Sequence, residues 1–268
     1  MLKKGAKAVL RSVGLQREQI AATRMAVERA TLASIPRTGA KRQWGRILAY
    51  HSVGQPRTGV NDVSLRRFER QLDIAIELGF EFVSALQIAH TGGAPNQLAI
   101  TVDDAWTSAA EHIAPIVRKR GLPWSLFVVS GWSDHAEDWT RKDILNWNQL
   151  KDLMGGDLEI GSHSVSHPDF TKLEPDQVKL ELEASRDGIA ENLGFVPKSF
   201  AIPYGQSANW NAMAHELAQS AGYDTIYSQA ERTGFPGTAP RTFVTKFDND
   251  RIFRALLNGA FDSWEEWV

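Results

Sequence analysis

Two histidines four residues apart, His163 and His167, stand directly before Pro168. The proline limits them to a tight loop or a single helical turn, which would present both imidazoles together. Two adjacent aspartates, Asp103 and Asp104, follow an apolar run elsewhere in the chain. Two imidazoles and one carboxylate oxygen suit Zn²⁺ or another divalent first-row metal, with positions left for water and substrate. The second carboxylate would stay free to act as a base on the activated water.

Each half of this set has an ordinary explanation when it is taken alone. Most histidine pairs at this spacing are incidental, and Asp104 would also serve as the cap of a helix that starts after Ala105. Two histidines and one carboxylate are also the ligands of Fe(II) oxygenases, but those sites usually lie in jelly-roll strands. The joint arrangement favours the metal site with one free aspartate.

The elements that must position these residues alternate from residue 46 onward between short apolar runs and helical patterns. Repeated β-α units predict a parallel sheet, and at this length an α/β fold of the (β/α) barrel type. The predicted strands cover residues 46–50, 80–83, 98–102, 124–129, 158–160, 199–202, 224–227 and 241–245. The predicted helices cover residues 65–78, 109–120, 146–154, 175–193, 209–221 and 250–258.

Polar residues follow four of these predicted strands. They are His51, the two aspartates, the segment 161–163 and the segment 203–205. The carboxyl ends of barrel strands share one rim, and active sites are built at that rim. The sequence therefore predicts that all four groups converge.

Charge is distributed unevenly along the 268 residues. Residues 1–46 carry eleven basic and two acidic residues, whereas the remainder carries 19 basic and 30 acidic residues. The acidic remainder argues against a nucleic-acid-binding protein. The chain has no cysteine, which excludes disulfides and thiolate metal ligands, and no apolar run approaches the length of a membrane span.

The basic leader is expected to be helical over residues 1–34, with a linker at 34–39. A basic amphipathic helix of this kind could contact an anionic membrane or an acidic partner; the favoured alternative is a helix packed on the acidic globule. We divide the chain into a leader with its linker (residues 1–45) and a barrel (residues 46–268). No secretory signal is evident, so the expected location is cytoplasmic, with a peripheral membrane contact as the variant.

Three segments resemble the motifs of the NodB-homology polysaccharide deacetylases, carbohydrate esterase family four. Residues 101–106 (TVDDAW) resemble the family's T-F-D-D-G motif, and residues 163–167 (HSVSH) match its H-S/T-x-x-H motif. Residues 200–205 (FAIPYG) resemble the third motif in its F-A-x-P-Y-G form. The resemblance extends from about residue 46 to the end and implies a distorted (β/α) barrel with an N-terminal helical extension.

The resemblance also implies a reaction, the metal-assisted hydrolysis of an N-acetyl group on a sugar. Carried over by position, Asp103 becomes the catalytic base, and Asp104, His163 and His167 become the metal ligands. The backbone N–H of Tyr204 would stabilise the oxyanion. Zinc is the expected metal, with cobalt, nickel and manganese as alternatives.

Three positions depart from the family pattern. Ala105 replaces a glycine, which costs little where φ is negative. Ala201 stands where many members carry an arginine that orients the base, and Arg241 is the candidate substitute. The late histidine that usually serves as general acid is missing. His51 is the candidate for that role, because residues 50–54 (YHSVG) resemble an early Y-H-x-x-G motif of some members.

Aromatic side chains near the motifs are candidates for sugar contacts. Trp106, Trp132 and Tyr204 are the predicted substrate-binding residues. The predicted function is a metal-dependent carbohydrate N-deacetylase that acts on an acetylated sugar of a glycan or glycan precursor. An amidase or imidase with the same site, and a sugar-binding pseudoenzyme suggested by Ala201, remain the alternatives.

Overall fold

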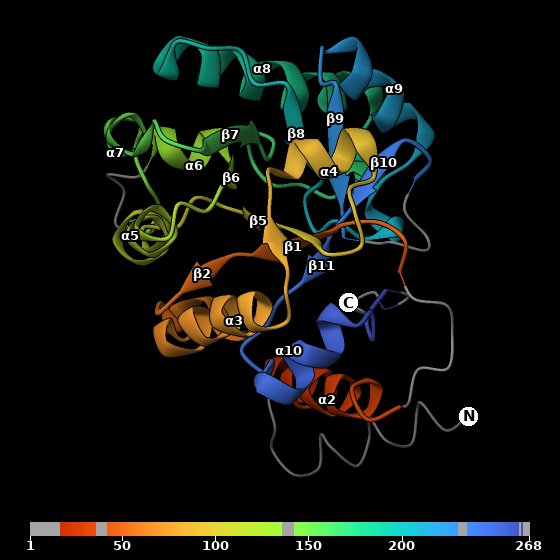
Figure 1. Cartoon of the computed structure of the whole chain (residues 1–268). Coiled ribbons are helices and arrows are strands. Elements are labelled where there is room, and N and C mark those ends of the chain that lie inside the picture. Colours follow the sequence, from red (N-terminus) through yellow and green to blue (C-terminus); the bar gives the residue numbers. More distant parts are fainter. Residues whose placement is uncertain (1–16, 36–41, 136–141, 230–234, 263, 265–268) are drawn as a thin grey trace, which may run out of the picture.

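The structure is a computed structural model that describes residues 17–35, 42–135, 142–229, 235–262 and 264. Nine strands of this part form one parallel sheet that curls into a barrel (Figure 1). Around the barrel they follow the order β10 (Thr238–Pro240), β9 (Thr225–Ser228), β8 (Ser199–Ala201), β7 (Leu158–Ser162), β6 (Trp124–Val128), β5 (Gln97–Val102), β1 (Arg46–Tyr50) and β11 (Thr242–Phe243). The ninth strand, β4 (Glu81–Phe82), pairs with β5 off this path.

The barrel is nearly closed by a single segment of chain. β10 pairs with β9, β11 pairs with β1, and only Arg241 separates β10 from β11. The Arg241 N–H still donates to the Ser228 carbonyl at the end of β9, whereas the Val244 N–H donates to Ala49 on β1. The expected (β/α) barrel is therefore confirmed. The predicted strand over residues 241–245 is present only as β11, because Arg241 still pairs with β9, and β10 had no prediction.

The inside of the barrel is filled by apolar side chains from alternating strand positions. They are Ile47, Ala99, Phe127, Ala201 and Tyr227. Helix α4 (Ala85–Thr91) adds Ile88 to this cluster and so covers the amino end of the barrel. The other end of the interior is left to polar residues, as the convergence of the motifs requires.

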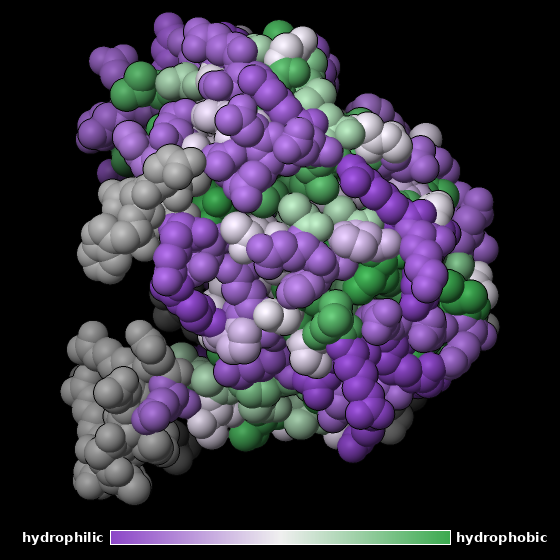
Figure 2. All heavy atoms as spheres, turned by 90° about the vertical axis from the view of Figure 1, so that its left-hand side faces the viewer, coloured by the Kyte–Doolittle hydropathy of each residue, from purple (hydrophilic) through white to green (hydrophobic). Residues whose placement is uncertain are grey.

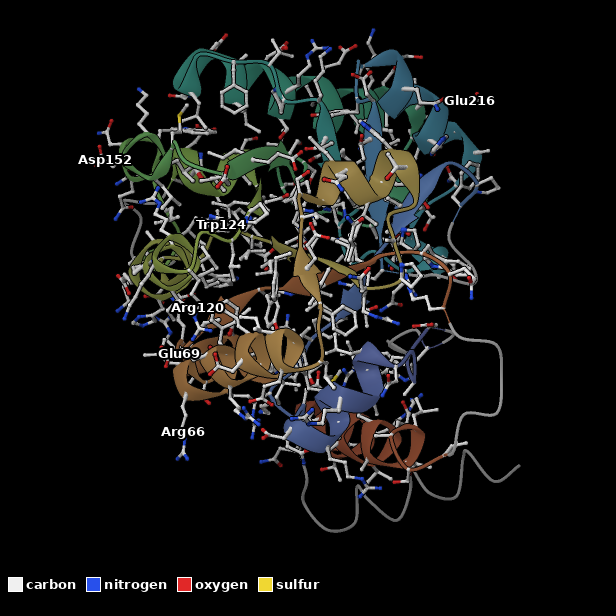
Figure 3. The ribbon with its side chains drawn as sticks, in the orientation of Figure 1. Arg66, Glu69, Arg120, Trp124, Asp152 and Glu216 are labelled. Carbon is white, nitrogen blue, oxygen red and sulfur yellow. The ribbon has the colours of Figure 1, made fainter. Side chains whose placement is uncertain are left out.

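Helices cover the outside of the barrel. Helix α3 (Leu65–Glu77) buries Phe68 and Leu72 toward the strands, while Arg66 points away from the barrel (Figure 3). The remaining helices are α5 (Ala114–Lys119) with the preceding π-helical turn η2 (Ala109–Ile113), α6 (Ser130–Asp134), α7 (Trp147–Leu153), α8 (Pro175–Leu193), α9 (Ala212–Ser220) and α10 (Asp250–Leu257). All six predicted helices are present, whereas α4 and α6 had no prediction.

Short elements at the carboxyl rim complete the described fold. Strands β2 (Ser52–Val53) and β3 (Asp62–Val63) flank the 3-10 turn η1 (Pro56–Asn61), directly after β1. The 3-10 turns η3 (Phe170–Lys172) and η4 (Ser207–Asn209) follow β7 and β8.

Part of the leader is a helix packed on the barrel. Helix α2 (Arg17–Leu32) lies beside α10 (Figure 1), and its Met25 and Arg29 side chains are buried. Residues 1–16 of the predicted leader helix and most of the predicted linker lie outside the described residues. The described part of the leader therefore has a packed face.

The outer face formed by α3, α5 and α7 is largely hydrophilic, with small separated apolar patches (Figure 2). Over the part of the chain that the structure describes, no helix has the combined length and apolarity needed to cross a bilayer.

Candidate active site

The two aspartates leave β5 at the carboxyl rim in different directions. The Asp103 N–H donates to the Tyr50 carbonyl at 2.9 Å, which extends the pairing of β5 with β1. Asp104 then adopts φ +74° and Ala105 φ +58°, so the backbone turns sharply. The turn sends the Asp103 side chain toward Arg241 and the Asp104 side chain toward the histidines. The negative φ under which Ala105 would cost little is not found.

The histidine loop follows β7 and is equally constrained. The His163 N–H donates to the Val128 carbonyl at 2.8 Å, which places His163 at the rim. Ser164 adopts φ +69° and His167 φ +60°, and the His167 N–H donates to the Ser164 hydroxyl at 2.9 Å. With Tyr204 at φ +63°, the non-glycine residues of the described chain that have positive φ all lie in the loops of this site. Such strain persists only where the surroundings enforce it, and it is typical of functional sites.

Helix α8 holds the histidine loop (residues 163–167) in this strained conformation. The Glu181 carboxylate accepts hydrogen bonds from the Val165 and Ser166 backbone N–H groups, both at 2.9 Å, and from the Ser166 hydroxyl. The Ser185 hydroxyl donates to the Ser164 carbonyl at 3.1 Å. The loop is thus held from one helix face by both a carboxylate and a hydroxyl.

The three predicted metal ligands lie together. Asp104 Oδ1 is 3.6 Å from His163 Nε2 and 3.8 Å from His167 Nε2, and one ligand atom from each residue lies within 4.8 Å of the others. Asp104 Oδ1 is buried, and it has no hydrogen-bond partner among the described residues. Buried oxygens without a partner are rare in native proteins. An oxygen and two imidazole nitrogens around one point fit a divalent cation such as zinc.

His163 is prepared to act as such a ligand. Its Nδ1–H donates to the Ala201 carbonyl at 2.7 Å, which leaves Nε2 as the nitrogen that faces Asp104. Burial lowers the pKa of His163 to about 4, so the ring is neutral at pH 7. Metal ligation requires a neutral imidazole whose second nitrogen is held by a hydrogen bond. Both conditions are met.

The other aspartate is paired with Arg241. Arg241 Nη1 and Nη2 donate to the two Asp103 oxygens at 2.6 and 2.8 Å, and both side chains are buried. Burial alone would raise the pKa of Asp103, but Arg241, with His163 and His51, holds it well below its usual range. A bidentate guanidinium fixes both the charge and the orientation of a carboxylate. Arg241 thus lies where the sequence analysis expected it, against Asp103.

The barrel interior shapes the pocket of the Arg241 guanidinium. The guanidinium lies 5.3 Å from the centre of the Phe127 ring and 5.9 Å from that of Tyr227. Gly161 makes room for Phe127, because a Cβ at this position would stand 2.5 Å from the Phe127 ring. These contacts leave the guanidinium little freedom to turn away from Asp103.

His51 lies at the same rim. Its ring packs edge-on against Phe243, with centroids 5.2 Å apart. His51 Nδ1 is buried without a hydrogen-bond partner among the described residues, and His51 lies close enough to Asp103 to help lower the pKa of that carboxyl. The structure therefore brings His51 together with the carboxylates.

Aromatic rings form an arc beside the candidate ligands. Trp106 and Trp132 have ring centroids 6.4 Å apart, Trp132 stacks on His167 at 5.6 Å, and Tyr204 meets His167 edge-on at 4.7 Å. Tyr204 is 46% exposed. All three predicted substrate residues thus lie at the site. Trp124, in contrast, is buried inside the molecule (Figure 3).

Several contacts of the site could not be expected from the motifs. The Trp106 indole N–H donates to Asp104 Oδ2 at 3.0 Å, which orients the carboxylate as well as lining the groove. Glu181 carries no sequence signal, because it is one of several acidic residues on α8. The Ala201 contact is made by the backbone, so the residue type does not reveal it. His215 lies buried in α9 with Trp210 and Phe235, away from this set.

Comparison with known sequences identifies a family and two relatives of this chain. The model of the polysaccharide deacetylase family matches residues 91–226, about half of the chain. The putative polysaccharide deacetylase YxkH of Bacillus subtilis is 24% identical over 226 residues, which cover 82% of this chain and 75% of that protein. The uncharacterized protein YlxY of Bacillus subtilis is 25% identical over 165 residues, which cover 61% of this chain but only 46% of YlxY.

Comparison with solved structures gives the same fold. The Streptococcus pyogenes deacetylase PplD, solved in complex with acetate, has a TM-score of 0.67 and 19% identity, with 81% of this chain and 98% of PplD covered. IcaB from Ammonifex degensii also has a TM-score of 0.67, with 23% identity and coverages of 82% and 98%. At these identities the likeness concerns the fold. From the family model, which spans half of its residues, it follows that the chain belongs to the polysaccharide deacetylase family.

Proposed function

We propose that the chain is a metal-dependent carbohydrate N-deacetylase that hydrolyses an acetamido group on a sugar. The observation that carries the proposal is the division of labour between the aspartates. Asp104 Oδ1 lies 3.6 and 3.8 Å from the Nε2 atoms of the two histidines, and it has no hydrogen-bond partner among the described residues. Both Asp103 oxygens are instead taken by Arg241, although Asp103 also lies 3.9 Å from His163 Nε2. A hydrolase of this kind needs both a metal-binding carboxylate and a second carboxylate that accepts a proton.

Asp104, His163 and His167 would hold the cation, with zinc expected first and cobalt, nickel or manganese as alternatives. A divalent cation in such a site makes water a better nucleophile and polarises a carbonyl oxygen. The Trp106 indole and the Ala201 carbonyl orient two of these ligands, so the donor atoms keep their direction.

Asp103 accepts the proton of the attacking water. The Arg241 ion pair keeps this carboxylate ionised and fixes its position. The water oxygen bonds to the acetamido carbon, and the Tyr204 N–H donates to the carbonyl oxygen as negative charge develops there. The C–N bond then breaks, the sugar amine takes a proton from His51, and acetate leaves.

The pairing of Arg241 with Asp103 also bears on the pseudoenzyme alternative. That alternative rested on Ala201, where many family members have an arginine. Arg241 supplies a guanidinium to Asp103 from the junction between β10 and β11, so the absence of an arginine at position 201 is no argument against catalysis. The aromatic arc of Trp106, Trp132 and Tyr204 supports a sugar as substrate, because flat ring faces bind the apolar faces of sugars.

Acetate release by the purified protein tests the proposal. N-acetylated sugar nucleotides, lipid-linked sugars and oligosaccharides would be supplied in turn, together with analysis of the bound metal. We expect near-stoichiometric metal and acetate release from one of these classes. Ring-opened product from a cyclic amide without acetate from any sugar would instead indicate an imidase, and the absence of bound metal would indicate a binding protein.

A further inference from the structure

Helix α2 reaches the barrel through a fully buried ion pair. Arg29 Nε and Nη2 donate to the Asp248 carboxylate at 2.5 and 2.6 Å, and neither side chain is exposed. The guanidinium is also covered by the rings of Phe261 and Trp264, with centroids 4.2 and 5.0 Å away. Breaking a buried charge pair costs far more free energy than breaking a surface pair such as that of Arg24 with Glu28 on the same helix.

The ion pair holds the backbone that closes the barrel. Arg29 Nη2 donates to the Phe243 carbonyl at 3.2 Å, and the Asp248 carboxylate accepts from the Thr245 N–H at 2.9 Å. The Thr245 hydroxyl donates to the same carboxylate. The segment that follows β11 is therefore fixed from one side by the leader helix.

Strand β11, which closes the barrel against β1, needs stabilisation from contacts other than its own pairing. β11 is only two residues long, and its register with β1 comprises two residue pairs. Isolated pairings of so few residues are not stable in water. Arg241, one residue before β11, carries the guanidinium that holds Asp103, and Phe243 packs against His51. The positions of the proposed base, Asp103, and of the proposed acid, His51, thus depend on the position of β11.

A second route runs from Asp248 to the same rim. The Asp248 backbone carbonyl accepts from the Gln71 amide at 3.0 Å, and Gln71 accepts from the Tyr50 hydroxyl at 3.0 Å. Tyr50 directly precedes His51. Figure 1 shows α2, α10 and α3 gathered on the side of the barrel from which these contacts come.

We propose that Arg29 is a positioning residue for the deacetylase site, acting through Asp248 and β11 on Arg241 and His51. The kinetic part of this inference rests on the proposed function; its structural part does not. The leader helix then belongs to the catalytic unit, although it lies outside the family-matched region.

The test compares Arg29→Met, Arg29→Lys and the double variant Arg29→Met with Asp248→Leu. Arg24→Met is the matched control, because Arg24 lies on the same helix with a half-exposed side chain and a surface partner, Glu28. The double variant removes both buried charges, so it should recover most of the thermal stability that Arg29→Met loses. Measurements are kcat, KM, the melting temperature and amide hydrogen exchange.

We expect kcat to fall by about 10- to 100-fold in Arg29→Met and in the double variant, with KM unchanged. Arg29→Lys should recover part of kcat, and Arg24→Met should match the wild type. Exchange of the Val244 and Thr245 amides should accelerate more than exchange of the β6 amides. A stably folded double variant with wild-type kcat and wild-type exchange at Val244 would overturn the inference.

Failure of the proposed function would look different. In that case the wild-type protein releases no acetate from any sugar class, and no kcat can be compared. Hydrogen exchange then decides alone. Selective acceleration at Val244 and Thr245 in the variants would support the positioning role of Arg29, and uniform or unchanged exchange would refute it.

Discussion

The functional side chains of the candidate site come from two parts of the chain that are held in different ways. Asp104, His163 and His167 come from the middle of the chain, from loops fixed locally by strained backbone and by α8. His51 and Arg241 lie next to strands β1 and β11, and they are held by contacts between distant parts of the chain, such as the Arg241–Asp103 pair and the pairing of β1 with β11. The metal-binding half of the site is therefore local, whereas the proton-transfer half depends on barrel closure.

The two adjacent aspartates belong to different halves of the site, so substitutions should separate loss of the proton acceptor from loss of the metal. We expect Asp103→Asn to lower acetate release by about 100- to 10,000-fold while the bound metal remains, because only the proton acceptor is lost. His163→Ala should remove both the activity and the metal, since a ligand is lost. Asp152→Asn is the control, on the outward face of α7 (Figure 3). Loss of metal in Asp103→Asn would contradict the division of labour.

Arg241→Met should cost both stability and activity. It leaves Asp103 buried without its cation, and breaking a buried pair costs about 3–5 kcal/mol. Urea unfolding and acetate release measure the two losses. Arg120→Met is the control, because its pair with Asp73 keeps contact with solvent, with the two side chains 25% and 48% exposed, and such pairs contribute at most about 1 kcal/mol. If Arg241→Met is as stable as the control, the buried pair of Arg241 with Asp103 does not contribute this free energy to folding.

Glu181→Gln should weaken metal binding and leave the barrel intact. The carboxylate holds two backbone N–H groups of the histidine loop, and loss of such outer contacts lowers metal affinity by about 10- to 100-fold. Competition with a zinc chelator measures the change. Glu183→Gln on the same helix is the control, since Glu183 pairs with Lys179 at the surface and lies outside the histidine loop. Equal zinc affinities in the two variants would show that Glu181 does not hold the histidine loop in place for metal binding.

Ala105→Gly should have the smallest effect, a gain of stability of at most about 1.5 kcal/mol. Relief of the left-handed strain is worth about 1–2 kcal/mol, and the added freedom of the unfolded chain offsets about 0.5–1 kcal/mol of it. The opposite sign is expected for Ala89→Gly inside α4, where φ is helical. Urea titration of both variants decides; destabilisation of Ala105→Gly would show that the methyl group packs better than the strain costs.

The sequence predicted most of the local half of the site. β1 and α8 have the predicted bounds, and the motif residues lie at the rim because strand ends in a parallel barrel share one side. The strand pattern also placed His51 at this rim, but its role as general acid and the choice of Arg241 came only from the family resemblance. The meeting of Arg241 with Asp103 depends on tertiary closure, which no local pattern contains.

The remaining features follow from interactions that residue types do not encode. The positive φ of Ala105 results from the turn that separates the two aspartates. The split of the last strand at Arg241 results from a change of hydrogen-bonding partner, from Ser228 to Ala49. Arg29 resembles any other arginine of a basic leader, and only the fold reveals that its partner is the buried Asp248.

The closing segment also sets the order in which the molecule can be completed during synthesis. A ribosome makes the aspartates and the histidines long before residue 241, so a nascent chain can assemble the metal ligands while Asp103 still lacks its guanidinium. Only after Arg241 and Asp248 have emerged can the first helix dock and the last strand close the barrel. A prematurely terminated chain would therefore contain every metal ligand and still lack an assembled proton-transfer site.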